Sequence, residues 1–219
     1  MTNTDRRPFA AALAATLGLA ALCWGLTAQK MSGMNMGPAA SLGPFPSFIA
    51  MWATMMAAMM LPGVAPAVLK VARDGGSTAT VLSFVGAYLA VWAAIGLPVY
   101  ALYQPHGTAM AGVITIAAGL YEFTPIKKEA RRRCCHGPIA SGVECAAYCV
   151  GTTAGLMAMQ IAIGIMSLSW MIAVTLVICA QKLFPPHRFV DAILGLALIG
   201  LGVAIIATPQ HVPGLMPAM

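Results

Sequence analysis

The apolar residues of this sequence come in long blocks, and this feature constrains the fold more than any other. Most blocks are roughly 17–25 residues long, the length at which an α-helix spans the hydrocarbon core of a bilayer. Hydrophobic residues make up 60% of the chain and charged residues 8%, whereas a water-soluble chain carries about 25% charged residues. Only helices satisfy every backbone polar group inside lipid without closing a barrel. The sequence therefore predicts an all-α polytopic membrane protein.

About seven transmembrane helices are expected, packed as a helical bundle with short connections. The first one resembles a signal peptide, but its apolar part is long and a poor cleavage site follows it, so we expect a retained anchor or signal-like helix over residues 1–29. Cleavage would leave six helices. The shortest two spans are candidates for tilted or re-entrant segments. The expected spans are 9–28, 47–69, 77–101, 109–123, 142–165, 168–182 and 188–207.

The basic residues indicate how the bundle is oriented. Of the 12 lysines and arginines, all but Lys30 fall on one side of the membrane when the N-terminus is placed in the cytoplasm. Cytoplasmic loops carry such an excess of basic residues. The net charge of +6 therefore reports topology and gives no reason to expect a nucleic-acid ligand. We expect a multi-pass protein of the bacterial cytoplasmic (inner) membrane, with its C-terminus outside.

The chain is expected to form one helical membrane domain, at residues 47–207, without a soluble domain. An outer loop rich in Met, Gly and Pro precedes it at 30–46, and an outer tail follows at 208–219. The largest polar segment, residues 124–141, is expected to be an inner loop that carries a basic cluster and three candidate metal-ligating residues. Those three residues are Cys134, Cys135 and His136.

Five methionines gather in the second span at helical spacing. Residues four apart share a helical face, so the row of Met51, Met55 and Met59 and the row of Met56 and Met60 form one broad stripe of thioethers. Thioethers are soft ligands that suit Cu(I) and reject hard ions such as Mg²⁺. Flexible packing, the usual role of methionine in a core, is the alternative. We predict that the last four of these methionines are metal ligands.

Two prolines, Pro62 and Pro66, follow the stripe. Each one removes a helical hydrogen bond and frees a carbonyl oxygen one turn earlier. Transporters use such freed groups to build ion sites. A kink that serves packing alone is the alternative.

Cys145 and Cys149 lie four residues apart in the fifth span and share a helical face. Two thiols there supply half of a tetrahedral soft-metal site, whereas two small residues at a helix contact are the alternative. At a rise of 1.5 Å per residue, Cys149 lies about 10 Å from the inner edge and Met60 about 20 Å from the outer edge. These depths coincide in a core about 30 Å thick. The sequence therefore allows a path of sulfur ligands across the bilayer.

Four more candidate ligands lie near the inner side. Cys134, Cys135 and His136 are expected at the inner mouth of the path. A reactive thiol pair made acidic by the neighbouring arginines is the competing interpretation. Glu122 completes the set, because an intramembrane carboxylate is a functional candidate. An ion pair with nearby basic residues is the alternative for Glu122.

With these residues assembled, the chain resembles an uncharacterised bacterial family of predicted metal-binding integral membrane proteins, a domain of unknown function. The similarity covers about residues 48–202, and it implies metal binding. Cys134 and Cys149 match cysteines of that family, whereas Thr152 and Thr153 stand where the family tends to have a cysteine pair. The similar stretches are MWATMMAAMMLP (51–62), FVGAYLAVW (84–92), YEFTPIK (121–127), YCVG and GLM (148–157), and GIMSLSWM with QKLFP (164–185).

We therefore predict a protein that binds or moves a soft metal ion, first of all Cu(I), through Cys and Met ligands in the bilayer. One alternative is a non-catalytic membrane scaffold or assembly partner, and another is a thiol redox protein. The sequence has no phosphate-binding loop and no hydrolase constellation, so we favour a non-enzymatic role. The expected cofactor is a metal ion. The expected partners are the lipid bilayer and either a second copy of the chain or another membrane protein, and no nucleic acid.

Overall fold

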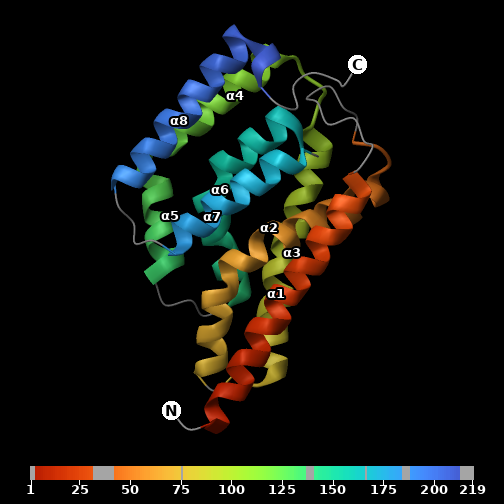
Figure 1. Ribbon diagram of the computed structural model, residues 1–219, viewed down its shortest axis with the longest axis vertical. Coiled ribbons are helices and arrows are strands. Elements are labelled where there is room, and N and C mark those ends of the chain that lie inside the picture. Colours follow the sequence, from red (N-terminus) through yellow and green to blue (C-terminus); the bar gives the residue numbers. More distant parts are fainter. Residues whose placement is uncertain are drawn as a thin grey trace. The chain divides into compact units, whose positions relative to one another are not determined.

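The computed structural model describes residues 3–31, 42–74, 76–136, 141–165, 167–183 and 188–212, and it is helical throughout these ranges apart from the connections. This confirms the predicted all-α fold, shown in Figure 1. Seven of the helices coincide with the seven expected spans. The helices are α1 (Asn3–Met31), α2 (Phe45–Arg73), α3 (Thr78–Leu102), α4 (Thr108–Tyr121), α5 (Pro125–His136), α6 (Gly142–Gly164), α7 (Leu168–Leu183) and α8 (Arg188–Ala207), followed by the 3-10 turn η1 (Pro209–His211).

Five of the described helices are long and apolar enough to cross a membrane, namely α1, α2, α3, α6 and α8. A sixth span arises if α4 and α5 are counted together, although they are bent by 65° where they meet. The remaining helix, α7, is apolar but has only 16 residues. The two spans that we expected to be short, tilted or re-entrant are thus a bent pair and a short helix. The set is compatible with a membrane protein.

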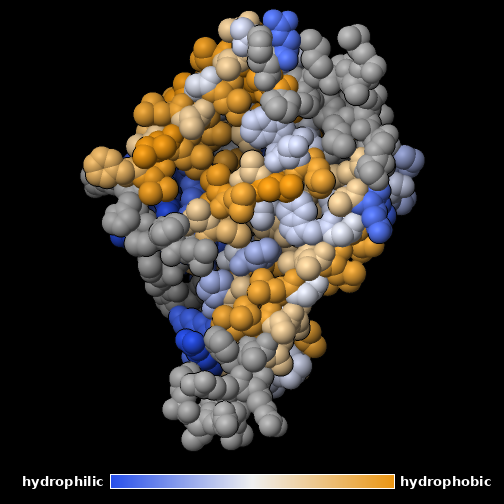
Figure 2. Space-filling model, in the orientation of Figure 1, coloured by the Kyte–Doolittle hydropathy of each residue, from blue (hydrophilic) through white to orange (hydrophobic). Residues whose placement is uncertain are grey.

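Large apolar side chains cover much of the surface (Figure 2). On α8 they recur at helical spacing, and Phe189 is 83% exposed and Ile193 67% exposed. The helices differ in how much of their apolar, potentially membrane-spanning stretch is buried inside the protein. This share is 72% for α2 and 61% for α6, but 28% or less for α1, α3 and α8. Exposed apolar faces of this kind suit contact with lipid. A buried functional site is therefore expected on α2 and α6, the most buried of these helices.

The chain divides into two compact units. The boundary passes through α6, so the start of this helix belongs to the first unit and the rest to the second. The first unit comprises Met1–Gln29, Gly43–Leu102 and Pro138–Ala147, and the second comprises Lys30–Leu42, Tyr103–Gly137 and Tyr148–Met219.

In the first unit, α2 and α3 lie side by side (Figure 1). The indole of Trp52 on α2 donates a hydrogen bond from Nε1 to the backbone oxygen of Trp92 on α3, at 2.8 Å. Gly96, one turn further along α3, makes room for that indole, because a β-carbon there would lie 2.6 Å from a ring carbon of Trp52. The buried residues of α3 form a single row at four-residue spacing: Phe84, Tyr88, Trp92 and Gly96.

In the second unit, α4 and α8 are packed along their lengths (Figure 1). Glycines face each other at two points of this contact. A β-carbon on Gly119 would lie 2.7 Å from the carbonyl oxygen of Gly195, and one on Gly202 would lie 2.7 Å from that of Gly112. Small residues let helix backbones approach this closely.

The segment that we expected to be an inner loop, residues 124–141, is helical from Pro125 to His136. Pro125 opens α5 at the position where its missing N–H costs nothing. Glu129 then pairs with Arg132 at 2.8 Å and with Arg133 at 2.7 Å, and such pairs three and four residues apart stabilise a helix. The hydrogen bond from Arg133 also lowers the pKa of the Glu129 carboxyl. The polarity that suggested a loop is therefore that of a charged helix.

Most of the expected outer loop, residues 32–41, and the end of the expected tail, residues 213–219, lie outside the described residues.

Candidate functional site

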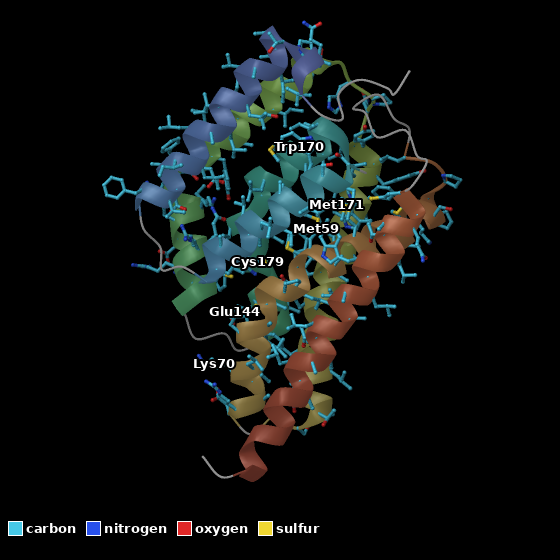
Figure 3. The ribbon with its side chains drawn as sticks, viewed as in Figure 1. Met59, Lys70, Glu144, Trp170, Met171 and Cys179 are labelled. Carbon is cyan, nitrogen blue, oxygen red and sulfur yellow. The ribbon has the colours of Figure 1, made fainter. Side chains whose placement is uncertain are left out.

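The methionine stripe of α2 is the most buried set of sulfur atoms in the first unit. Each of its five thioether side chains is at most 7% exposed, and Met59 and Met60 are fully buried. Figure 3 shows Met59 midway along α2 and Lys70 near its carboxyl end. The helix continues through Pro62 and Pro66 without interruption. The five methionines are Met51, Met55, Met56, Met59 and Met60.

An aromatic cluster fixes the amino-terminal end of this stripe. The ring of Phe48 stacks on that of Trp52, with ring centroids 5.9 Å apart, and lies 5.2 Å from the ring of Tyr100. The hydroxyl of Tyr100 donates to the backbone oxygen of Gly43 at 3.1 Å. These contacts, with the hydrogen bond from Trp52, set the register of α2 against α3.

That register determines which part of α3 lies level with the carboxyl-terminal half of the stripe. The connection between α2 and α3 is short, so the two helices run antiparallel. Trp52 lies opposite Trp92 and Gly96. Moving eight residues along α2, to Met60, corresponds to moving back by the same rise along α3. Met60 is therefore level with the part of α3 between Phe84 and Tyr88.

Cys145 lies at the same level of the first unit. Its side chain is 2% exposed. Gly142, three residues earlier on α6, touches α3 there, because a β-carbon on it would lie 3.1 Å from the backbone nitrogen of Tyr88. Three residues correspond to about 4.5 Å of helical rise. The thiol of Cys145 is thus within one turn of the level of Met60.

Cys149 belongs to the second unit and has different surroundings. Its side chain is fully buried, and Lys182 on α7 donates a hydrogen bond from Nζ to its Sγ at 3.0 Å. The backbone oxygen of Cys149 accepts a hydrogen bond from Thr153 at 2.9 Å. That Cys145 and Cys149 act together stays a prediction.

Glu122 takes part in a buried ion pair with Lys127, the alternative that the sequence left open. Gln181 also donates to the same carboxylate oxygen, from Nε2 at 3.5 Å. The other oxygen, Oε1, has no hydrogen-bond partner in the described part of the chain. All three side chains are at most 2% exposed.

A second buried ion pair continues this network. Arg131 pairs with Asp191 at the start of α8 and donates from a second nitrogen to the backbone oxygen of Gln181 at 3.0 Å. Lys127 and Arg131 are four residues apart, so both lie on the buried face of α5. From the sequence, Lys127 and Arg131 were considered only as positive charges that indicate topology. Their spacing in a polar helix is the signal that could have identified them.

The candidates at the inner mouth are all on α5. Cys134 is partly exposed, and the side chains of Cys135 and His136 lie outside the described ones. Within the ranges that the structure describes, no three His, Cys, Asp or Glu side chains come together in a way that could hold a metal ion.

Comparison with known proteins adds one result. A family model described as PpoB2, copper chaperone, matches residues 49–205, which is well over half of the 219 residues. No curated protein matches, and no solved structure does so either. The matched segment contains the α2 methionines, both cysteines of α6 and the buried ion pairs. The chain belongs to the PpoB2 copper chaperone family.

Proposed function

We propose that this member of the PpoB2 copper chaperone family holds Cu(I) inside a membrane, between the methionine face of α2 and Cys145, and passes the ion to a partner protein. One observation carries this proposal. Five buried thioethers occupy ten residues of the most buried long helix, and a buried thiol lies level with their inner end. The description of the family as copper chaperones is the reason for proposing copper as the bound ion.

The chemistry of this ligand set suits Cu(I). Thioethers and thiolates are soft donors, and they select Cu(I) over hard divalent ions. A buried ion needs a charge of opposite sign nearby. The thiolate of Cys145 would supply that charge, whereas the methionines supply neutral donors. The ligands that we propose for this site are Cys145, Met55, Met56, Met59 and Met60. Four further candidate ligands belong to the second unit and are not part of this site: Cys149, Cys134, Cys135 and His136.

The helices and their surface support the membrane setting. Five helices are long and apolar enough to cross a bilayer, and their exposed faces carry large apolar side chains. The distribution of basic residues favours a cytoplasmic N-terminus in a bacterial inner membrane. In this setting the bound copper ion would be shielded from water until it is transferred to the partner protein.

A membrane scaffold remains the second candidate. The same burial is what packing methionines would show, since methionine fills irregular gaps in cores. The two functions differ in what happens when methionine is replaced by leucine. The volume is nearly conserved, so a scaffold tolerates the change, whereas a copper site loses its donors.

Copper content separates these candidates. We would purify the full chain anaerobically in detergent after growth with copper and measure its metals by plasma mass spectrometry. We expect close to one copper per chain in the parent and a large loss both in Cys145→Ser and in Met56→Leu/Met59→Leu/Met60→Leu. Met110→Leu is the matched control, because Met110 is 54% exposed on α4, and it should keep its copper. A parent without copper, or variants that retain it, would overturn the proposal.

A further inference from the structure

We propose that α6 and α7 form a second Cu(I) site, built from the thioethers of Met157 and Met171 and the amide oxygen of Gln160. This inference rests on the proposed function, because it takes the ligand to be Cu(I). It uses none of the α2 methionines, however, and all three of its residues belong to the second unit.

The two helices form a hairpin. The end of α6 at Gly164 and the start of α7 at Leu168 are separated by three residues. At the other end of the hairpin, the Nζ of Lys182 contacts the Sγ of Cys149 at 3.0 Å. Two helices joined by a short connection and touching at their far ends are antiparallel neighbours. Figure 3 shows Met171 near the start of α7, with Cys179 further along it.

The contact between Cys149 and Lys182 sets the register of this hairpin. Gln160 follows Cys149 by eleven residues, and Met171 precedes Lys182 by eleven residues. Eleven residues make about three helical turns and about 16 Å of rise on both helices. Gln160 therefore shares a face with Cys149, and Met171 shares a face with Lys182. Because Cys149 faces Lys182, Gln160 and Met171 face each other at the same level.

The side chain of Gln160 has buried polar atoms that a ligand could satisfy. Its side chain is 1% exposed, and neither its amide oxygen nor its amide nitrogen has a hydrogen-bond partner in the described part of the chain. Leaving such a group unsatisfied in a buried position is costly. The threonines on the same two faces are already engaged, since Thr153 donates to the carbonyl of Cys149 and Thr175 to that of Met171.

The neighbours of Gln160 determine which ligand fits. Met157 lies three residues before it on the same face of α6 and is 7% exposed, and Met171 is fully buried. Thioethers are soft donors that disfavour hard cations, and a glutamine oxygen serves as a weak ligand at some copper sites in the position that methionine otherwise takes. Two thioethers and one amide oxygen therefore suit Cu(I).

The charge balance indicates what this site does. All three donors are neutral, so a bound Cu(I) would keep its positive charge in a buried position, which is costly. Such a site binds weakly and releases readily. It is suited to passing the ion along the hairpin and not to storing it.

Titration with Cu(I) tests this site. We would titrate the anaerobic, detergent-purified full chain with Cu(I) against a chromogenic Cu(I) chelator, and record the thermal midpoint with and without copper. The site variant is Met157→Leu/Gln160→Leu/Met171→Leu. The matched control is Met159→Leu, because Met159 is equally buried on α6 but its side chain points about 100° away from that of Gln160. The α2 triple variant is run beside them.

We expect the site variant to lose one weakly held equivalent of copper while keeping the tighter one, and Met159→Leu to keep both. If the site variant binds as much copper as the parent and is only more stable, Gln160 meets water or nothing, and the second site is overturned while the α2 site stands. If the α2 variant keeps its copper but the site variant loses it, the second site stands and the proposed α2 site fails. A parent that binds no Cu(I) overturns both.

Discussion

A β-carbon on Gly119 would lie 2.7 Å from the carbonyl oxygen of Gly195, so α4 and α8 meet there backbone to backbone. The oxygen belongs to helix backbone and cannot move aside cheaply. We expect Gly119→Ala to push the helices apart and destabilise the protein by about 1–3 kcal/mol, as overpacking does in cores. Thermal unfolding in detergent measures this effect.

Gly200→Ala is the matched control on the same pair of helices. Nothing in the described part of the chain lies within 4 Å of a β-carbon at Gly200. Alanine is favoured over glycine in a helix by up to about 1 kcal/mol, so this variant should unfold at the same temperature as the parent or above it. Equal destabilisation by both changes would contradict the close contact.

The ion pair between Glu122 and Lys127 gives a second prediction. Lys127→Met removes one partner of a fully buried pair and leaves a carboxylate in an apolar interior, which costs about 3–5 kcal/mol. The double variant Glu122→Gln/Lys127→Met removes both charges and should recover most of the lost stability. Midpoints of chemical or thermal unfolding for the parent, the two single variants and the double variant measure this coupling.

Glu129→Gln serves as its control. Glu129 also forms ion pairs on α5, but with exposed arginines, and exposed pairs contribute little. We expect no measurable change in the unfolding midpoint. If Lys127→Met were as harmless as Glu129→Gln, the buried network would have no structural role.

The contact between Trp52 and Gly96 gives a third prediction. Gly96→Ala would place a β-carbon 2.6 Å from the indole, so the ring must move and its hydrogen bond to Trp92 must lengthen. We expect a lower unfolding temperature, a shifted tryptophan fluorescence maximum and a lower copper content, because Trp52 anchors the methionine stripe.

Gly86→Ala on the same helix is the control, since a β-carbon there meets nothing in the described ranges within 4 Å. It should leave the fluorescence maximum and the copper content unchanged, and the unfolding temperature equal to that of the parent or higher. A Gly96→Ala variant that behaves like Gly86→Ala would show that the indole does not set the register of α2 and α3.

Orientation in the membrane gives a fourth prediction. The distribution of basic residues predicts a cytoplasmic N-terminus, and the seven spans expected from the sequence would then place the C-terminus outside. Alkaline phosphatase fused after Met219 should therefore be active in a bacterial host, whereas fusion after Arg133, on α5, should be inactive. Activity at Arg133 together with inactivity at Met219 would reverse the topology.

The sequence by itself determined the helices. Apolar blocks of spanning length identified seven of them, because hydropathy and helix formation depend on residues that are neighbours in the chain. The same reasoning failed for α5, since its charges suggested a loop. The ion pairs of Glu129 with Arg132 and Arg133 show that those charges support a helix instead.

The spacing of the methionines also predicted a stripe on α2, but not how deeply it is buried. Burial depends on the contacts of Trp52 with Trp92 and Gly96, which are 40 and 44 positions away in the sequence. No local sequence pattern determines which residues so far apart in the chain come into contact.

Only the tertiary structure decided which polar groups meet. Arg131 reaches Asp191, sixty residues away, because glycines let α4 and α8 approach closely enough to bring the start of α8 to α5. Cys149 meets Lys182, 33 residues away, for the same kind of reason. Helix formation is a local property of the chain, whereas the partner of a buried charge or thiol depends on how closely distant backbones can pack.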